Sequence, residues 1–163
     1  MIRRGAALLL IGLVPFLAGC PPQPKSAPGA AAPDDWATAM LNNVNAQRAA
    51  SGLGPIALCG TLNNAAQAHS ADQAARATMS HIGGDGSNLS QRAGRAGYNG
   101  WTNLGENVAY GYGSVDGVMV GWMSSPGHRA NILSGDYTHL GVGRAGNGGV
   151  DYWTQVFGRN GTC

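Results

Sequence analysis

Apolar residues recur at helical spacing in three long stretches of the chain. The first runs from Trp36 to Ala50 and follows two aspartates that can cap a helix. The second runs from Thr61 to Thr78 and is rich in alanine. The third begins after Ser114, a capping residue, and ends at the breaker Ser125-Pro126-Gly127. The pattern therefore predicts three long helices.

Shorter patterns lie between and after these helices. They predict a short helix from Ser87 or Asn88 to Ala96, a strand over 103–110, a helical turn over 131–133, and strands over 139–145 and 152–159. The last two strands are joined by Gly146-Asn147-Gly148-Gly149, which is typical of a hairpin. Helices come first, the clearest strand pair comes last, and strand–helix–strand alternation is rare. The fold class is therefore α+β, or a three-layer α/β/α arrangement.

The N-terminal segment is a targeting signal rather than part of the fold. A short positive start precedes an apolar run, Ala6 to Leu17, that is too short to span a bilayer. The run ends in Leu17-Ala18-Gly19-Cys20, which looks like a bacterial lipobox. We predict a lipoprotein signal peptide over 1–19, with Cys20 lipidated. The alternative is an ordinary secretory signal with an incidental cysteine. Pro21 after the cysteine favours the outer membrane if the source bacterium has two membranes.

Composition divides the rest of the chain in two. Residues 20–33 form a tether rich in proline and alanine, and residues 34–163 are long enough for one domain with its own core. Loss of Arg3 and Arg4 with the signal peptide reduces the ten basic residues to eight, which equals the number of acidic residues. No basic stripe remains for nucleic acid. The expected partners are a membrane, through the lipid anchor, and a small molecule or other ligand of the cell envelope.

With Cys20 lipidated, Cys59 and Cys163 form an even pair in an oxidising compartment. We expect a disulfide that ties the C-terminus to the loop before the second long helix. The alternative is two buried free thiols.

Glu106 is the only glutamate of the chain, and it lies between two segments that carry His81 and His128. Two neutral imidazoles and a carboxylate suit zinc or another divalent cation and leave a coordination position open. Each residue also has a structural alternative. His81 fits a loop histidine bonded to backbone, Glu106 a carboxylate that accepts N–H bonds at a strand turn, and His128 a residue of the loop that follows Pro126.

The other histidines and the tryptophans fit structural roles. His69, with Asp72 three residues later, reads as a helix-surface or core histidine. His139 precedes a strand and is typical of an element boundary. Trp122 and Trp153 are expected in the core. Trp101, in a glycine-flanked loop, is expected to be exposed.

Five motifs in order resemble one family. They are SHIGGDG at 80–86, GEN at 105–107, GWMSSPGHRANIL at 121–133, LGVG at 140–143 and YWTQVFG at 152–158. The chain resembles the CAP superfamily (SCP/PR-1-like) in its short bacterial form. The resemblance implies an α-β-α sandwich with a central antiparallel sheet, and a cleft lined by two histidines and two acids.

Matched by motif, His81 is the first histidine of that cleft, Glu106 the first acid and His128 the second histidine. Asn107 and Ser125 complete the expected ligand-binding set. The second acid of the family is missing, since Ser125 stands in its region. That absence disfavours any mechanism that needs two carboxylates.

The resemblance favours a binding protein whose cleft takes a lipid-like or glycan-like ligand, since eukaryotic relatives are associated with sterol and other lipid binding. One alternative is a metal- or triad-dependent peptidase or esterase with His81, Glu106 and His128 as catalytic residues. A serine nucleophile would have to come from near these histidines, and no Gly-x-Ser-x-Gly elbow is present. The other alternative is an envelope interaction module with a vestigial cleft.

Overall fold

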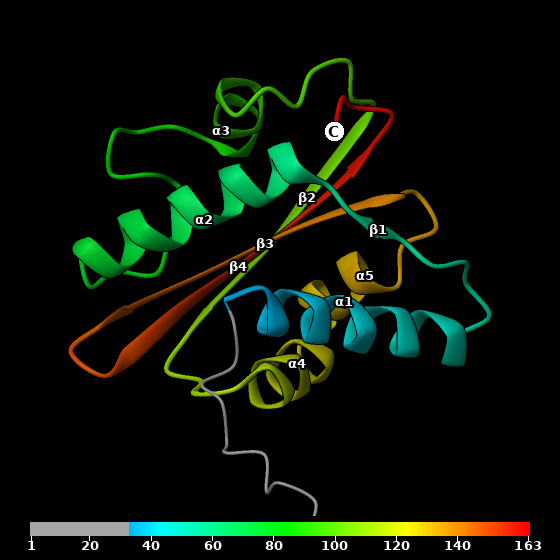
Figure 1. Ribbon diagram of the computed structural model, residues 1–163, viewed down its shortest axis with the longest axis horizontal. Coiled ribbons are helices and arrows are strands. Elements are labelled where there is room, and N and C mark those ends of the chain that lie inside the picture. The colour runs from blue at the N-terminus through cyan, green and yellow to red at the C-terminus, as the bar shows by residue number, and fades with distance from the viewer. Residues whose placement is uncertain (1–32) are drawn as a thin grey trace, which may run out of the picture. The chain divides into compact units, whose positions relative to one another are not determined.

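A computed structural model describes residues 33–163 as five helices and four strands (Figure 1). In chain order these are α1 Pro33–Ala50, β1 Ala57–Leu58, α2 Gly60–Ala75, α3 Leu89–Arg95, β2 Asn103–Tyr110, α4 Val115–Ser124, α5 Pro126–Ile132, β3 His139–Asn147 and β4 Val150–Arg159. The predicted signal peptide, Cys20 and nearly all of the tether lie outside the described residues. Within 33–163, no helix has the length and apolar character needed to cross a membrane.

The four strands form one sheet in the order β1-β3-β4-β2. β3 and β4 pair antiparallel through a tight hairpin, and β2 pairs antiparallel with β4 along its whole length. β1 adds two residues parallel to β3, with Ala57 opposite His139. The predicted α+β sandwich is confirmed, but the sheet is mixed rather than purely antiparallel.

Helices cover both faces of the sheet and enclose two cores. In Figure 1, α2 and α3 lie on one side of the strands, and α1, α4 and α5 lie on the other. Successive side chains of β3 point to opposite faces of the sheet. Leu140 and Val142 point to one face and pack into the core with α1 and α4. Gly141 and Gly143 face the backbone of α2 instead. Trp122 and Trp153 are buried in the first of these cores, and Trp101 is exposed, as predicted.

Local chemistry explains where the element boundaries differ from the predictions. α2 ends at Ala75, three residues before the predicted end, because Ala77 adopts a φ of 48° that a helix cannot contain. Pro126 occupies the first turn of α5, so the predicted single turn is a helix that begins at this proline. Ser114, the predicted cap of α4, accepts a backbone N–H, and so does Asn88, the residue just before α3.

The predicted disulfide joins Cys59 to Cys163 across 104 residues. It links the start of α2 to the end of the chain. Cys59 is fully buried, and Cys163 is exposed.

β2 is an edge strand of the sheet, and the candidate site lies along it. Successive side chains of a strand point to opposite faces of the sheet. Glu106 therefore faces the layer of α2 and α3, while Asn107 faces the layer of α4 and α5. The free edge of β2 can be reached from both layers.

Candidate functional site

Glu106 is the centre of a buried polar cluster. Its side chain is 3% exposed, and both carboxylate oxygens are hydrogen-bonded. Oε1 accepts from Nδ1 of His81 at 2.8 Å, and Oε2 accepts from Nη2 of Arg92 at 2.6 Å. Arg92 lies on α3, with its side chain 8% exposed. The guanidinium therefore balances the buried carboxylate.

His81 is the exposed member of this cluster. Its side chain is 58% exposed, and its Nδ1 is directed at Glu106. Because a carboxylate can only accept, Nδ1 carries the proton and Nε2 of the neutral ring keeps its lone pair. A histidine held this way presents Nε2 to solvent as a base or a metal ligand.

Buried polar contacts fix the loop that carries His81. Arg92 donates from Nη1 to the carbonyls of His81 at 3.0 Å and Ser87 at 2.8 Å. Gln73 of α2 accepts from the N–H of Ser80 at 3.1 Å. Nε2 of His69 lies 2.8 Å from the Ser80 carbonyl. The loop is therefore attached to both helices of its layer.

His69 brings a third imidazole close to Glu106. Its Nε2 lies 4.0 Å from Oε2 of Glu106, and the residue is 1% exposed. Because the Ser80 carbonyl can only accept, Nε2 carries the proton, and Nδ1 has no hydrogen-bond partner within the described chain. Burial lowers the pKa of His69, although the nearby carboxylate of Glu106 opposes this shift. His69 is thus a core histidine, one of the two roles that its sequence context suggested, but its partner is the Ser80 carbonyl rather than Asp72, which pairs with Arg76.

Two asparagines, Asn107 and Asn131, position His128, which lies on α5 in the other helix layer. Asn107 donates from Nδ2 to the His128 carbonyl at 3.1 Å and to Oε1 of Gln155 at 3.0 Å. Asn131 of α5 donates to Oδ1 of Asn107 at 2.8 Å and to the carbonyl of Glu106 at 3.1 Å. These bonds fasten α5 to β2. Asn107 is fully buried, so it braces the site rather than offering a group to a ligand.

The His128 ring is half-buried beside the free edge of β2. Burial lowers the pKa of His128, and positive charge on His81 lowers it further. The lowered pKa favours the neutral form of His128.

A groove of about 280 Å³ runs beside His128 along the edge of β2. We call it the β2 groove. Its lining is apolar and aromatic apart from two polar residues, Ser125 and His128; the full set is Met79, Val108, Ala109, Tyr110, Tyr112, Gly121, Trp122, Ser125 and His128. Met79, Tyr110 and Tyr112 are unusually exposed for large apolar or aromatic side chains, at 43%, 56% and 38%. The groove thus offers an apolar wall with a polar end.

The candidate residues from the sequence therefore take three positions. His81 and Glu106 are in contact, His128 and Ser125 line the β2 groove, and Asn107 fastens α5 to the sheet. These residues do not form a compact metal cage. Among residues 33–163, the one set of three metal-ligating side chains whose donor atoms lie within 4.8 Å of one another is Cys59, His139 and Cys163.

Sequence reasoning missed Arg92 and did not assign His69 to this site. Arg92 lies in the predicted short helix, 14 residues before Glu106, and no local motif links an arginine to a carboxylate at that distance. The signal that could have found it is elementary. A lone buried glutamate needs a cation, and Arg92 is on the helix next to the His81 loop.

An α-β-α sandwich with this His–Glu pair at an edge strand, and a second histidine from the opposite layer, defines a CAP-type domain. The chain belongs to the CAP family: residues 41–157 match the cysteine-rich secretory protein family. It has the short bacterial form of the domain.

Two relatives come from Bacillus subtilis (strain 168). The uncharacterized protein YkwD is 33% identical over 121 residues, which make up 72% of this chain and 45% of that protein. The uncharacterized membrane protein YlbC is 34% identical over 120 residues, which make up 72% of this chain and 33% of that protein. The chain therefore spans less than half the length of either relative.

Solved structures support the fold. An outer surface protein from Borrelia burgdorferi superposes with a TM-score of 0.70 at 19% identity, covering 76% of this chain and 91% of that one. An extracellular protein with an SCP domain from Bacillus anthracis gives a TM-score of 0.69 at 27% identity, covering 81% and 45%. By their descriptions, both are surface or extracellular proteins.

Proposed function

We propose that this protein is a lipid-anchored CAP-domain protein of the cell envelope that binds a small amphipathic ligand in the β2 groove. The apolar part of the ligand lies against Met79, Tyr110 and Tyr112, and its polar end meets His128 and Ser125. The observation that carries the proposal is this groove, in which exposed aromatic side chains end at a half-buried, neutral histidine.

The dimensions of the groove limit what it can hold. Small-molecule pockets usually enclose about 300–1,000 Å³. At about 280 Å³ the β2 groove lies just below this range, which suits one sugar ring or a segment of an acyl chain. Exposed tyrosines serve either ligand, because a ring presents an apolar face and a hydroxyl that can hydrogen-bond.

A divalent cation such as zinc is proposed as an aid to binding at His81 and His128. Glu106 is then the carboxylate that orients His81, since both of its oxygens are engaged by His81 and Arg92. The metal would act as a Lewis acid that draws the polar end of the ligand toward the two imidazoles.

Binding of a fluorescent fatty acid tests the groove. We expect the purified chain to bind the probe, and Tyr112→Ala and His128→Ala each to weaken binding about 10-fold, because each removes a wall or the polar end of the site. Val120→Ser is the matched control, since Val120 is 67% exposed and lies outside the groove. Competition by unlabelled fatty acid or by a soluble oligosaccharide distinguishes the two ligand classes. Equal affinities in all four proteins would refute the groove as the site.

Calorimetric titration with Zn²⁺ tests the metal in the same proteins. Heat of binding that persists undiminished after His81→Ala with His128→Ala would exclude these imidazoles as ligands. If the probe binds equally well with and without Zn²⁺, ligand binding in the groove does not require the metal.

Hydrolysis is less well supported than binding. A serine nucleophile must be hydrogen-bonded to its base. Among the described residues, no hydrogen bond joins the hydroxyl of Ser80, Ser124 or Ser125 to an imidazole. The Ser80 hydroxyl accepts from the N–H of Ile82 at 2.9 Å, and that of Ser124 donates to the carbonyl of Val120 at 2.8 Å. We therefore propose a binding role for His81, Glu106 and His128 rather than a catalytic one.

The lipid anchor is tested by cell fractionation. We expect the native chain to sediment with membranes, because two or more acyl chains give stable anchoring. Cys20→Ser removes the acceptor thiol and is expected to leave the chain unacylated. Mass spectrometry of the N-terminal peptide identifies the modification. An unmodified Cys20 in membrane-bound protein would contradict the prediction.

A further inference from the structure

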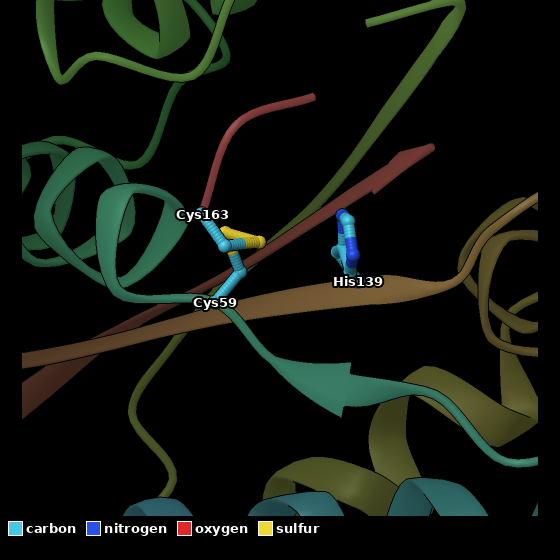
Figure 2. A group of neighbouring side chains, drawn as sticks. All are labelled: Cys59, His139 and Cys163. Carbon is cyan, nitrogen blue, oxygen red and sulfur yellow. A yellow bond between two sulfur atoms is a disulfide. The ribbon is translucent and has the colours of Figure 1, made fainter. Parts of the chain in front are cut away.

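A second group of ligating side chains lies away from the β2 groove. The groove is lined by the end of β2, whereas this group lies near its start: His139 of the group pairs with Gly158, which also pairs with Leu104. Sulfur atoms of Cys59 and Cys163 and a ring nitrogen of His139 all lie within 4.8 Å of one another. Figure 2 shows the three side chains together, at the start of α2, at the end of the chain and at the start of β3. In the oxidised protein the two sulfurs form the disulfide and cannot bind a metal as thiolates.

The C-terminal segment is held in place by more than the disulfide. Thr61 donates to the Thr162 carbonyl at 2.8 Å. The N–H of Thr162 donates to the Asn99 carbonyl at 3.1 Å, and the N–H of Gly161 donates to the Tyr98 hydroxyl at 3.2 Å. These contacts do not depend on the S–S bond. We therefore expect Cys163 to stay beside Cys59 when the bond is broken.

His139 is oriented by a buried partner. Its Nδ1 lies 2.9 Å from the hydroxyl of Tyr98, which is fully buried. Metal-binding histidines characteristically have their second nitrogen fixed by an outer-shell group. With Nδ1 engaged by Tyr98, Nε2 is the nitrogen left to bind a metal.

We propose that reduction of the Cys59–Cys163 disulfide creates a metal site, in which two thiolates and Nε2 of His139 bind a thiophilic divalent cation of the zinc class. Zinc lies about 2.3 Å from sulfur and about 2.0 Å from imidazole nitrogen, so tetrahedral donors are about 3.6–3.8 Å apart. One ring nitrogen of His139 and the two sulfurs lie within 4.8 Å of one another, and we expect rotation of the reduced side chains to bring Nε2 and both thiolates to this spacing. Cys163 is exposed, so water could complete the coordination of a cation held by these three residues.

The chemistry requires a dithiol reductant, and its balance is simple. One thiolate of the reductant attacks Sγ of Cys163, the S–S bond breaks, and Cys59 leaves as a thiolate. The second thiolate of the reductant then attacks the mixed disulfide, and the reductant departs as a disulfide after giving two electrons. The cation replaces the two thiol protons. Cys59 is the N-cap of α2, where the helix N-terminus favours the thiolate as leaving group and as ligand.

Cobalt binding tests the site, because thiolate–Co²⁺ bonds give charge-transfer absorption. The full-length chain is used with Cys20→Ser, so that two thiols remain, and with His81→Ala and His128→Ala, so that the proposed cleft metal is absent. We expect no such absorption before reduction by a phosphine, and one Co²⁺ per chain after it, displaced by Zn²⁺. His139→Ala is expected to weaken affinity at least about 10-fold, and Tyr98→Phe about 10-fold as a positioning residue.

Three results would overturn the proposal. The reduced, folded chain binds no Co²⁺ with thiolate character, or His139→Ala binds it as tightly as the parent, or circular dichroism shows that reduction unfolds the domain. None of these results bears on the β2 groove, because the parent for this experiment already lacks both cleft histidines.

Discussion

Glu106→Gln is expected to lower the free energy of unfolding by about 3–5 kcal/mol, because it leaves the Arg92 guanidinium buried without a counter-charge. Both side chains are at least nine-tenths buried, and their charged atoms are 2.6 Å apart. Glutamine keeps the size of the side chain and a carbonyl oxygen that accepts from His81. The loss therefore reports the missing charge rather than a cavity.

Urea denaturation measures this effect, and an exposed ion pair provides the control. Asp85 pairs with Arg95 at the same distance, 2.6 Å, but these side chains are 53% and 58% exposed. Asp85→Asn is expected to change stability little, since exposed pairs are screened by solvent.

A second variant removes the charge imbalance. In Glu106→Gln with Arg92→Met both charges are absent, but so are the hydrogen bonds from Arg92 to the carbonyls of His81 and Ser87, so only part of the lost stability is expected to return. If Glu106→Gln costs no more than Asp85→Asn, the buried pair does not support the cluster. Glu106 would then contribute no more to the free energy of unfolding than an exposed carboxylate.

The sequence predicted the local elements well, because each is encoded by its own spacing of apolar residues. The predicted strand over 103–110 coincides with β2, Ser114 acts as the predicted cap, and α3 begins directly after Asn88. β1 was missed for a physical reason. Two residues carry no periodicity, and their extended conformation comes from pairing with His139 and Leu140, some 80 residues later.

Only part of the candidate site could be predicted from the sequence. The pairing of His81 with Glu106 came from the family resemblance, because 25 residues of intervening chain carry no geometric information. Arg92 was missed because its contact depends on how α3 packs against the sheet. The disulfide could be predicted because Cys59 and Cys163 are the only cysteines left after Cys20 is assigned to the lipid.

Gly143→Ala is expected to destabilise the domain by about 2–3 kcal/mol, the usual cost of an extra methyl group in a filled core. In a strand with open space, replacing glycine with alanine stabilises by about 0.5–1 kcal/mol. The sign of the change therefore distinguishes the two situations. An added Cβ at Gly143 would overlap the backbone of Ala66 and Gln67 in α2, and backbone cannot rotate away as a side chain can.

Gly54→Ala is the matched control, because an added Cβ there meets no atom within 4 Å. Its stability in urea is expected to stay within about 0.5 kcal/mol of the parent. Equal stabilities of the two variants would contradict the close approach of α2 to β3.

The close approach of α2 to β3 also positions the candidate site, since His69 lies one turn beyond Ala66 and 4.0 Å from Glu106. Displacing α2 moves His69 and the Ser80 carbonyl that it holds, and with them the loop of His81. The glycines of β3 thus help to position His69 and the loop of His81, both on the α2 side of the sheet.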